Sequence, residues 1–187
     1  CYQSYRNLDR FAHISCNSRM LMTAALILTA YCVGSISSAI IISSMLGLGD
    51  PRDVGSGNPG ATNILRYAGK KAAAATLLGD SAKGVLPVLA AHALGYNAPL
   101  LTAVGFAAFL GHLFPVYYGF RGGKGVATFI GVNLALNLWV GVAFIALWLG
   151  VAAVTRYSSL AALVATALTP AVAWWFDEPF AALALYV

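Results

Sequence analysis

Charged residues are scarce in this sequence. Lys, Arg, Asp and Glu together make up 9% of its 187 residues, whereas hydrophobic residues make up 60% and the mean hydropathy is +0.78. Because a soluble domain carries about 25% charged residues, this chain has too few polar groups to cover a globule of its size in water. The excess apolar surface must face lipid or other apolar helices. The composition therefore excludes an ordinary soluble domain and predicts an integral membrane protein.

Acidic residues, cysteine and the common catalytic motifs are also sparse. Six Asp and Glu stand against 11 Lys and Arg, and the resulting charge of +5 is typical of the cytoplasmic loops of membrane proteins. The three cysteines have no metal-binding spacing, and no His/Cys/Asp/Glu cluster has one either. Neither an HxxxxD pattern nor a G-x-S-x-G nucleophile elbow is present. We therefore expect no metal, no cofactor and no covalent enzyme intermediate.

The apolar residues fall into long runs, and about 20 such residues cross a bilayer once. The runs cover roughly 21–47, 72–95, 98–118, 126–154 and 158–176, and a sixth begins at Phe180. We interpret the polar residues 1–19 as an N-terminal extension that is non-native or disordered. Residues 20–187 are then one membrane domain, which we expect to continue beyond Val187.

The fourth run is too long for one upright span, so it is either one strongly tilted helix or two short helices. At ~1.5 Å per residue it would measure ~44 Å, against a hydrocarbon core of ~30 Å. A break near Asn133–Asn137 places Arg156 on the same side as the basic loops 48–71 and 119–125, which the positive-inside rule makes cytoplasmic. We therefore predict an all-α, polytopic membrane protein that forms a seven-helix bundle when complete, with six spans and the start of a seventh in this sequence.

Two loops on the predicted cytoplasmic side combine glycines with fixed cations. The first runs from Arg52 to Arg66 and reads RDVGSGNPGATNILR, and the second runs from Gly111 to Gly125 and reads GHLFPVYYGFRGGKG. Glycine lets backbone N–H groups converge on an anion, and Lys and Arg add positive charge. Two such loops on one face predict a site for two phosphate groups or for one larger polyanion.

These glycines also admit plainer interpretations. Gly55, Gly57 and Gly60 match G-x-G-x-x-G, but a dinucleotide site needs a preceding strand, and this loop follows a membrane helix. The second loop does not meet the Walker A pattern. Each loop on its own could also be only a tight turn between helices. The two together, with Ser, Asn, Thr, Arg and Lys but little acid, favour an anion site.

Three ionisable residues within the apolar runs are candidates for a functional role. Asp80 and Lys83 are one helical turn apart inside the second run, and charges within a membrane usually pair or mark a site. A structural ion pair and a substrate-facing role are both open for them. His112 precedes the second glycine loop, where it could hydrogen-bond that loop or act as a base, and we favour the structural role.

At these loops the sequence resembles the bacterial acyl-phosphate:glycerol-3-phosphate acyltransferases, the PlsY family. The resemblance extends over residues 22–187 and rests on GSGNPGATN at 55–63, GGKGVAT at 122–128 and RYSSLA at 156–161. It implies a seven-helix fold in the bacterial cytoplasmic membrane, with the active site near the cytoplasmic face. It also implies transfer of a fatty acyl group from acyl phosphate to the 1-hydroxyl of glycerol 3-phosphate. The products would be lysophosphatidic acid and inorganic phosphate, in the first step of phospholipid synthesis.

The resemblance implies roles for individual residues. The catalytic residues would be Ser56, Thr62, Asn63, Arg66 and Lys124. Substrate and phosphate would be bound by Gly55, Gly57, Asn58, Gly60, His112, Gly122, Gly123 and Gly125. Supporting roles would fall to Asp80, Lys83 and Ser159. The family's third motif, a basic segment after the last helix, would lie beyond Val187, so we expect this fragment to be incompetent for turnover.

The implied partners are the two substrates, membrane lipid and, transiently, the soluble enzyme that makes acyl phosphate; nucleic acid is not among them. From the residues alone, two other classes of protein stay open. A small transporter for an anionic solute would suit broken helices and glycine loops, although both loops lie on one side and no inverted repeat is evident. A noncatalytic membrane scaffold would leave the chemistry of the loops unexplained.

Overall fold

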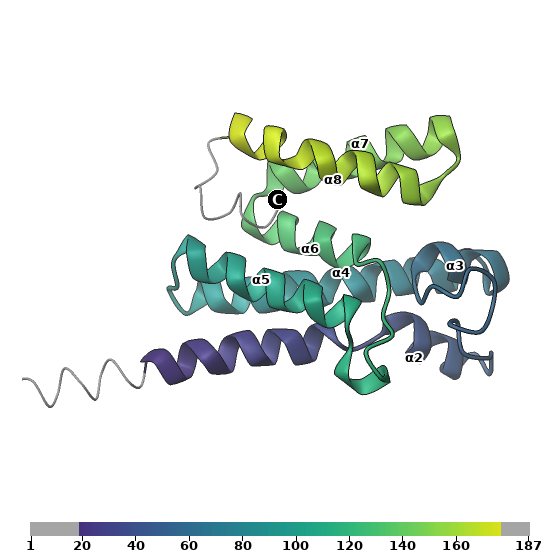
Figure 1. Cartoon of the computed structure of the whole chain (residues 1–187), viewed down its shortest axis with the longest axis horizontal. Coiled ribbons are helices and arrows are strands. Elements are labelled where there is room, and N and C mark those ends of the chain that lie inside the picture. Colours follow the sequence, from purple (N-terminus) through teal and green to yellow (C-terminus); the bar gives the residue numbers. More distant parts are fainter. Residues whose placement is uncertain (1–18, 177–187) are drawn as a thin grey trace, which may run out of the picture.

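The computed structural model describes residues 19–176, and within that range the protein is all-α (Figure 1). Its elements are the helix Arg19–Gly34, α2 (Ser38–Met45), α3 (Ala61–Tyr67), α4 (Gly69–Ala93), α5 (Ala98–Leu113), the 3-10 helix η1 (Val116–Tyr118), α6 (Val126–Leu136), α7 (Leu138–Thr155) and α8 (Ser158–Trp175). The long helices run side by side along the long axis of the molecule. The predictions made for residues 1–18, and for a sixth apolar run from Phe180, lie outside the described residues.

The first apolar run forms two helices rather than one. Arg19–Gly34 and α2 differ in direction by 41°. Ser37 begins α2, because its side-chain oxygen accepts a hydrogen bond from the backbone N–H of Ile40 at 3.4 Å. The break leaves the C-terminal end of one helix and the N-terminal end of another inside the bundle. Polar groups from other helices must satisfy those ends, since lipid offers no partners.

The fourth apolar run is broken where the distribution of positive charge predicted. α6 ends one residue before Asn137 and α7 begins one residue after it. The Asn137 side chain accepts hydrogen bonds from the N–H groups of Trp139 at 2.8 Å and Val140 at 3.2 Å, so it caps α7. The 11 residues of α6 span only ~16 Å, which is about half of the hydrocarbon core.

The connection after the first run contains more helix than the sequence predicted. Residues 48–71 were expected to be a loop, but α3 lies within it and α4 begins at Gly69. Three cations of this segment are therefore helical: Arg66, Lys70 and Lys71. α3 is stabilised by the burial of Ile64 against small residues of α2 and α4. Gly69, with φ +84°, makes the turn between α3 and α4.

Glycines bring the long helices into close contact. A Cβ atom at Gly34 would overlap the carbonyl of Ala108, and one at Gly111 would overlap the carbonyl of Tyr31. The helix Arg19–Gly34 and α5 therefore touch backbone to backbone. α4 and α6 meet in the same way at two further glycines, Gly84 and Gly131. Such contacts are the usual means by which apolar helices associate in lipid, where the hydrophobic effect gives no drive.

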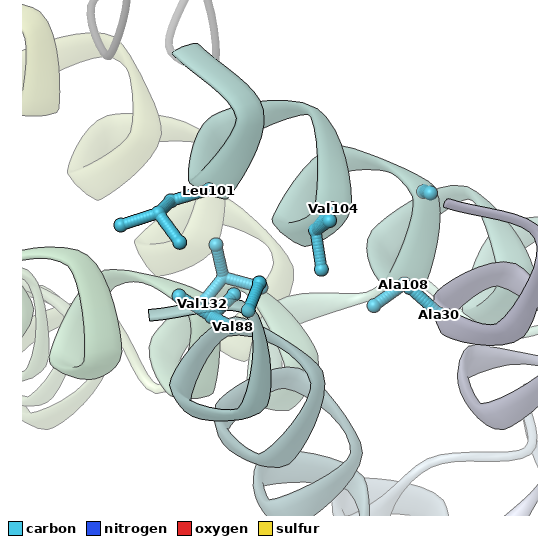
Figure 2. Close-up of a cluster of buried hydrophobic side chains, with 8 residues drawn as sticks. Ala30, Val88, Leu101, Val104, Ala108 and Val132 are labelled. Atoms are coloured by element: carbon cyan, nitrogen blue, oxygen red, sulfur yellow. The ribbon is translucent and has the colours of Figure 1, made fainter. Parts of the chain in front are cut away.

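The buried core lies between the first helix, α4, α5 and α6 (Figure 2). Its labelled members are Ala30, Val88, Leu101, Val104, Ala108 and Val132. A second cluster, centred on Phe129 and Phe144, joins α6 to α7 and α8. Large apolar side chains also cover the outside of the protein, and Val154 is 86% exposed. An apolar exterior around a small core is what the low charge content predicted.

Three helices within residues 19–176 are long and apolar enough to cross a membrane, and the bent first run would make a fourth. The three are α5 continued through η1, α7 and α8. α4 has the length, at ~38 Å, but carries four charged residues, which are Lys70, Lys71, Asp80 and Lys83. The structure thus supports several spans of α-helix.

Three connecting segments gather at one end of the helices (Figure 1). They are residues 46–60, residues 114–125 and the turn between α7 and α8. The opposite end carries the α4–α5 turn, the α6–α7 break and the C-terminal end of α8. Exposed Trp139 and Trp174 lie at that opposite end, where a membrane–water interface favours tryptophan.

Candidate active site

Asn63, in α3, shapes the first glycine loop from beneath. Its side-chain nitrogen donates hydrogen bonds to the carbonyls of Pro51 at 3.0 Å and Val54 at 2.9 Å, and its oxygen accepts one from the N–H of Ser56 at 3.0 Å. The residue is 1% exposed. Both N–H groups of the amide are therefore used within the protein. This arrangement ties Asn63, for which the resemblance implied a catalytic role, to the backbone of the first loop.

The top of the first loop is a turn built on glycine. Gly55 and Gly57 have φ values of +64° and +70°, a region that side chains disfavour. A Cβ atom at Gly55 would also overlap the side-chain oxygen of Asn63. Ser56, between the two glycines, and Thr62, in the first turn of α3, are exposed. Asn58 and Gly60 continue the turn and are partly exposed.

The second glycine loop is shaped by His112 at the end of α5. The N–H of Gly123 donates to the His112 carbonyl at 3.1 Å. A Cβ atom at Gly122 would overlap that carbonyl, and one at Gly123 would overlap the imidazole ring. Gly125 has φ +76°, and a Cβ there would overlap the ring of Phe109. Only glycine fits these three positions, and His112, 6% exposed, lies buried behind the loop.

Lys124 is an exposed cation of the second loop, as is Arg121. Its ammonium group donates a hydrogen bond to the Ser159 hydroxyl at 2.5 Å. Ser159 belongs to the first turn of α8, so this contact joins the second loop to the α7–α8 turn. The structure thus brings together Lys124 and Ser159, which the sequence placed only as separate members of a site.

Asp80 and Lys83 lie at the break in the first run. The Lys83 ammonium is 3.0 Å from a carboxylate oxygen of Asp80 and donates to the carbonyl of Ile36 at 2.6 Å. The same carboxylate oxygen accepts from the N–H of Ser38 at 3.4 Å. A carboxylate at the start of α2 and an ammonium just past the end of the preceding helix both match the helix dipoles. The ion pair expected from the spacing is present, and it is buried.

His112 lies between this ion pair and the second loop. Its Nδ1 atom is 3.9 Å from the Asp80 carboxylate, while its backbone carbonyl holds Gly123. The side chains of Asp80, Lys83 and His112 are buried, at 2%, 6% and 5% exposure. Their positions suit support of the loops better than contact with a substrate.

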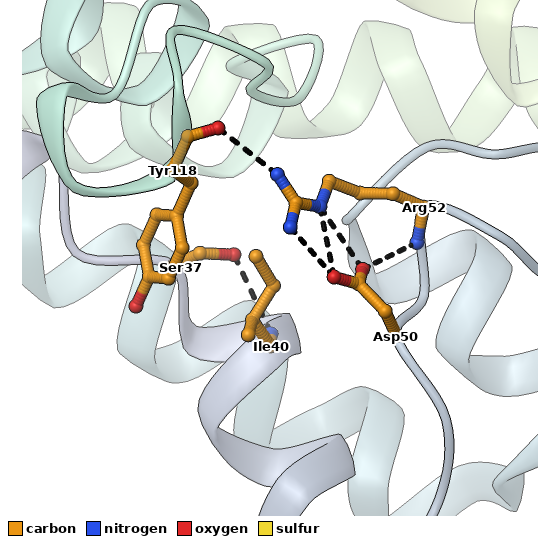
Figure 3. Close-up of polar contacts among 5 residues, drawn as sticks. All are labelled: Ser37, Ile40, Asp50, Arg52 and Tyr118. Carbon is orange, nitrogen blue, oxygen red and sulfur yellow. Dashed lines mark hydrogen bonds and ion pairs between the residues drawn. The ribbon is translucent and has the colours of Figure 1, made fainter.

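Arg52 joins the two glycine loops to each other (Figure 3). Its Nε and Nη2 atoms donate to the Asp50 carboxylate at 3.0 and 2.6 Å, and its Nη1 atom donates to the carbonyl of Tyr118 at 3.0 Å. The hydrogen bond from Arg52 holds the pKa of Asp50 below its usual value, and the same bond raises the pKa of Arg52. From the sequence, Arg52 was expected only as a cation of the first loop, and Asp50 and Tyr118 were given no role. The only signal for them is the acidic residue two positions before Arg52.

Known proteins have sequences similar to this one. A model of the family described as glycerol-3-phosphate acyltransferase matches residues 24–187. The chain is 61% identical over 151 residues to the glycerol-3-phosphate acyltransferase of Thioalkalivibrio sulfidiphilus, covering 81% of this chain and 74% of that one. It is 57% identical over 141 residues to the enzyme of Hydrogenovibrio crunogenus, covering 75% and 68%. This chain belongs to the glycerol-3-phosphate acyltransferase family.

Solved structures share the fold of this acyltransferase. The crystal structure of PlsY, an integral membrane glycerol 3-phosphate acyltransferase, in its glycerol 3-phosphate form matches with a TM-score of 0.82 and 38% identity. The lysophosphatidic acid form matches with a TM-score of 0.81 and 36% identity. Each match covers 88% of this chain and 82% of the other. The acyltransferase is therefore an all-α integral membrane protein, as its composition predicted.

Proposed function

We propose that this acyltransferase moves a fatty acyl group from acyl phosphate to the 1-hydroxyl of glycerol 3-phosphate. The products are lysophosphatidic acid and inorganic phosphate. The observation that carries the proposal is the contact of Arg52 with the Tyr118 carbonyl, because it holds two glycine- and cation-containing loops side by side. Support comes from PlsY, whose two forms contain glycerol 3-phosphate and lysophosphatidic acid, a substrate and a product of such a transfer.

The reaction needs little from the protein except placement and charge. The 1-hydroxyl oxygen attacks the acyl carbonyl carbon, the bond from that carbon to the phosphate oxygen breaks, and phosphate leaves with the electron pair. The hydroxyl proton passes to a phosphate oxygen of the substrates. Because the leaving group is already activated, no protein nucleophile is required, and catalysis rests on orienting the reactants and stabilising developing charge.

Each loop has its own task in this reaction. Ser56, Gly57, Asn58 and Thr62 bind one phosphate group at the first loop. Gly122, Gly123 and Gly125 bring the backbone of the second loop close to the other. Lys124 and Arg66 neutralise the phosphate charge, and Ser159 orients Lys124 through its hydroxyl. The residues beneath the loops fix these positions, and they are Asn63, Asp80, Lys83 and His112.

The location of the enzyme follows from the basic residues at the loop end. We propose that this end faces the cytoplasm in a bacterial inner membrane, since Lys and Arg concentrate on that side. The acyl tail then lies in lipid while both phosphate groups face water. We also propose seven spans for the fold and a transient contact with the soluble enzyme that supplies acyl phosphate.

The test is product formation by protein expressed from the complete gene and purified in detergent. We expect lysophosphatidic acid from acyl phosphate and glycerol 3-phosphate, and a loss of about 100-fold or more in Lys124→Met, because one charge-assisted contact to a transition state is worth about 3 kcal/mol. Lys71→Met is the matched control. It makes the same substitution at another exposed lysine, in the first turn of α4, and should keep activity. No product from the wild type, or equal activity of the two variants, contradicts the proposal.

A further inference from the structure

We infer that Arg52 is a positioning residue that sets the separation of the two substrate loops during acyl transfer. The inference rests on the proposed function, and it concerns a residue that does not itself touch a substrate. It starts from the observation that one guanidinium group is bonded to both loops (Figure 3).

The geometry uses every nitrogen of the guanidinium group. Nε and Nη2 engage the Asp50 carboxylate as a fork, and Nη1 reaches the backbone carbonyl of Tyr118. The Arg52 backbone N–H also donates to Asp50, at 2.8 Å. Arginine is suited to this task because its planar fork fixes direction as well as distance, which a lysine ammonium does not. Because each of its three side-chain nitrogens is bonded within the protein, the guanidinium is held in place by the two loops themselves.

The first-loop end of this contact is firmly held. Asn63 binds the carbonyls of Pro51 and Val54, which stand on either side of the segment that carries Arg52. The position of the Arg52 backbone is therefore fixed relative to α3. Side chains of Asp50 and Arg52 are 28% and 21% exposed, so water competes only partly for their bond.

The second-loop end is held as well. The Tyr118 carbonyl closes the 3-10 helix η1, whose last N–H donates to Pro115 at 3.2 Å. A cation at the C-terminal end of a helical turn is favoured by the dipole of that turn. The guanidinium also lies 5.9 Å from the centre of the Tyr118 ring, within range of a cation–π interaction. Arg52 thus meets Tyr118 in two ways.

The consequence for catalysis is a change in rate rather than in binding. Each loop keeps its own internal hydrogen bonds on average without Arg52, although it opens more often, because Asn63 holds the first and the His112 carbonyl holds the second. Each substrate then still binds, but the attacking oxygen and the acyl carbon are no longer held in register. A misplacement of about 1 Å can cost about 100-fold in rate.

The kinetic test compares Arg52→Gln with Lys71→Gln, a matched loss of one positive charge. We expect kcat per folded Arg52→Gln enzyme to fall about 10- to 100-fold, with both KM values within about threefold of the wild type. Lys71→Gln should match the wild type. If kcat and both KM values are unchanged, Arg52 has a structural role alone, and the inference is overturned. If kcat is unchanged but a KM is raised, Arg52 binds substrate directly, and the inference is overturned as well.

A double variant that swaps Asp50 and Arg52 distinguishes the effect of the bond between the loops from the effect of the ion pair within the first loop. In Asp50→Arg/Arg52→Asp the ion pair is restored, but residue 52 has no side-chain donor for the Tyr118 carbonyl. We expect this double variant to stay as slow as Arg52→Gln. Recovery of wild-type kcat would show that only the ion pair matters and would overturn the inference.

Amide hydrogen exchange tests the inference without any turnover. Loss of Arg52 should raise exchange in both 46–60 and 114–125, whereas Lys71→Gln should change neither. Faster exchange in the first loop alone, or in neither, overturns the inference. If the wild-type protein makes no product while the exchange result holds, the proposed function fails but the bond between the loops stands.

Discussion

Asn63 and Asn97 are two asparagines that stabilise opposite ends of the protein. Asn63 binds the first glycine loop at the site end, and Asn97 caps α5 at the other end, where its oxygen accepts from the N–H of Leu100 at 3.4 Å. Both residues use a polar side chain to hold backbone groups. Only one of them, however, is near the residues proposed for catalysis.

We predict that Asn63→Ala destabilises the protein by about 1–3 kcal/mol, because the carbonyls of Pro51 and Val54 lose a buried donor. Activity per folded molecule should fall as well, since the turn around Ser56 loses its support. Asn97→Ala should cost about 1 kcal/mol, as loss of a helix cap does, without loss of activity. Thermal unfolding and initial rates measure the two effects. Full activity in folded Asn63→Ala would contradict its positioning role.

A prediction for pH follows from the ion pair of Asp50 and Arg52. The pKa of Asp50 is lower in the folded protein than its usual value of 3.8, because Arg52 donates to the carboxylate. The pair therefore stabilises the fold fully above pH ~4 and loses that contribution as pH falls through the lowered pKa. The Tm difference between wild type and Asp50→Asn should shrink as the pH is lowered below 4. A difference that is constant down to pH 2.5 would contradict this account.

At the scale of residues, the sequence indicated the loops but not which side chains lie beneath them. Glycine with Lys, Ser and Thr predicts an anion site from composition alone, and the comparisons confirm the family. From the sequence, Asn63 is as compatible with binding a ligand as with binding backbone, and only the folded chain shows that its amide binds the backbone of the first loop. Arg52 bonds a carbonyl 66 positions away, and no local pattern encodes such a partner.

Among the elements, the broken first run depends on a buried ion pair. Asp80 meets the start of α2 and Lys83 meets the carbonyl that follows the preceding helix. Removing one partner leaves a buried charge, which costs about 3–5 kcal/mol, whereas replacing both leaves none.

We therefore predict that Asp80→Asn and Lys83→Met are each less stable than the double variant Asp80→Asn/Lys83→Met. Unfolding of the four proteins in detergent gives the coupling free energy of the pair. Additive effects of the two substitutions would show that the pair does not act as a unit. Lys70→Met, on the exposed first turn of α4, is the matched control and should be neutral.

Of the two breaks within the apolar runs, the sequence predicted one and not the other. The break at Asn137 was predictable, because an unbroken run would be too long and would leave Arg156 on the wrong side. The break at Ser37 was not predicted, although the first run would measure ~40 Å as one helix, because the ion pair that supports the break comes from α4. α3 was missed for another reason: its seven residues follow a segment rich in Gly, Pro and Asn, and its burial depends on contacts with α2 and α4.

For the whole molecule, the two ends of the helices should lie on opposite sides of the membrane. We predict that a cysteine at Asp53, in the first loop, reacts with an impermeant thiol reagent only from the cytoplasmic side. A cysteine at Tyr96, in the α4–α5 turn, should react only from the opposite side. The background has Cys1, Cys16 and Cys32 replaced by serine. Labelling of both positions from one side would contradict the proposed orientation.

The pattern of initial velocities is the most direct test of simultaneous binding by the two loops. If both reactants are held together and no acyl-enzyme forms, varying acyl phosphate at several fixed concentrations of glycerol 3-phosphate gives intersecting double-reciprocal lines. Inorganic phosphate is then released only when glycerol 3-phosphate is present. Parallel lines, together with a burst of phosphate in its absence, would reveal a covalent intermediate and would contradict the account.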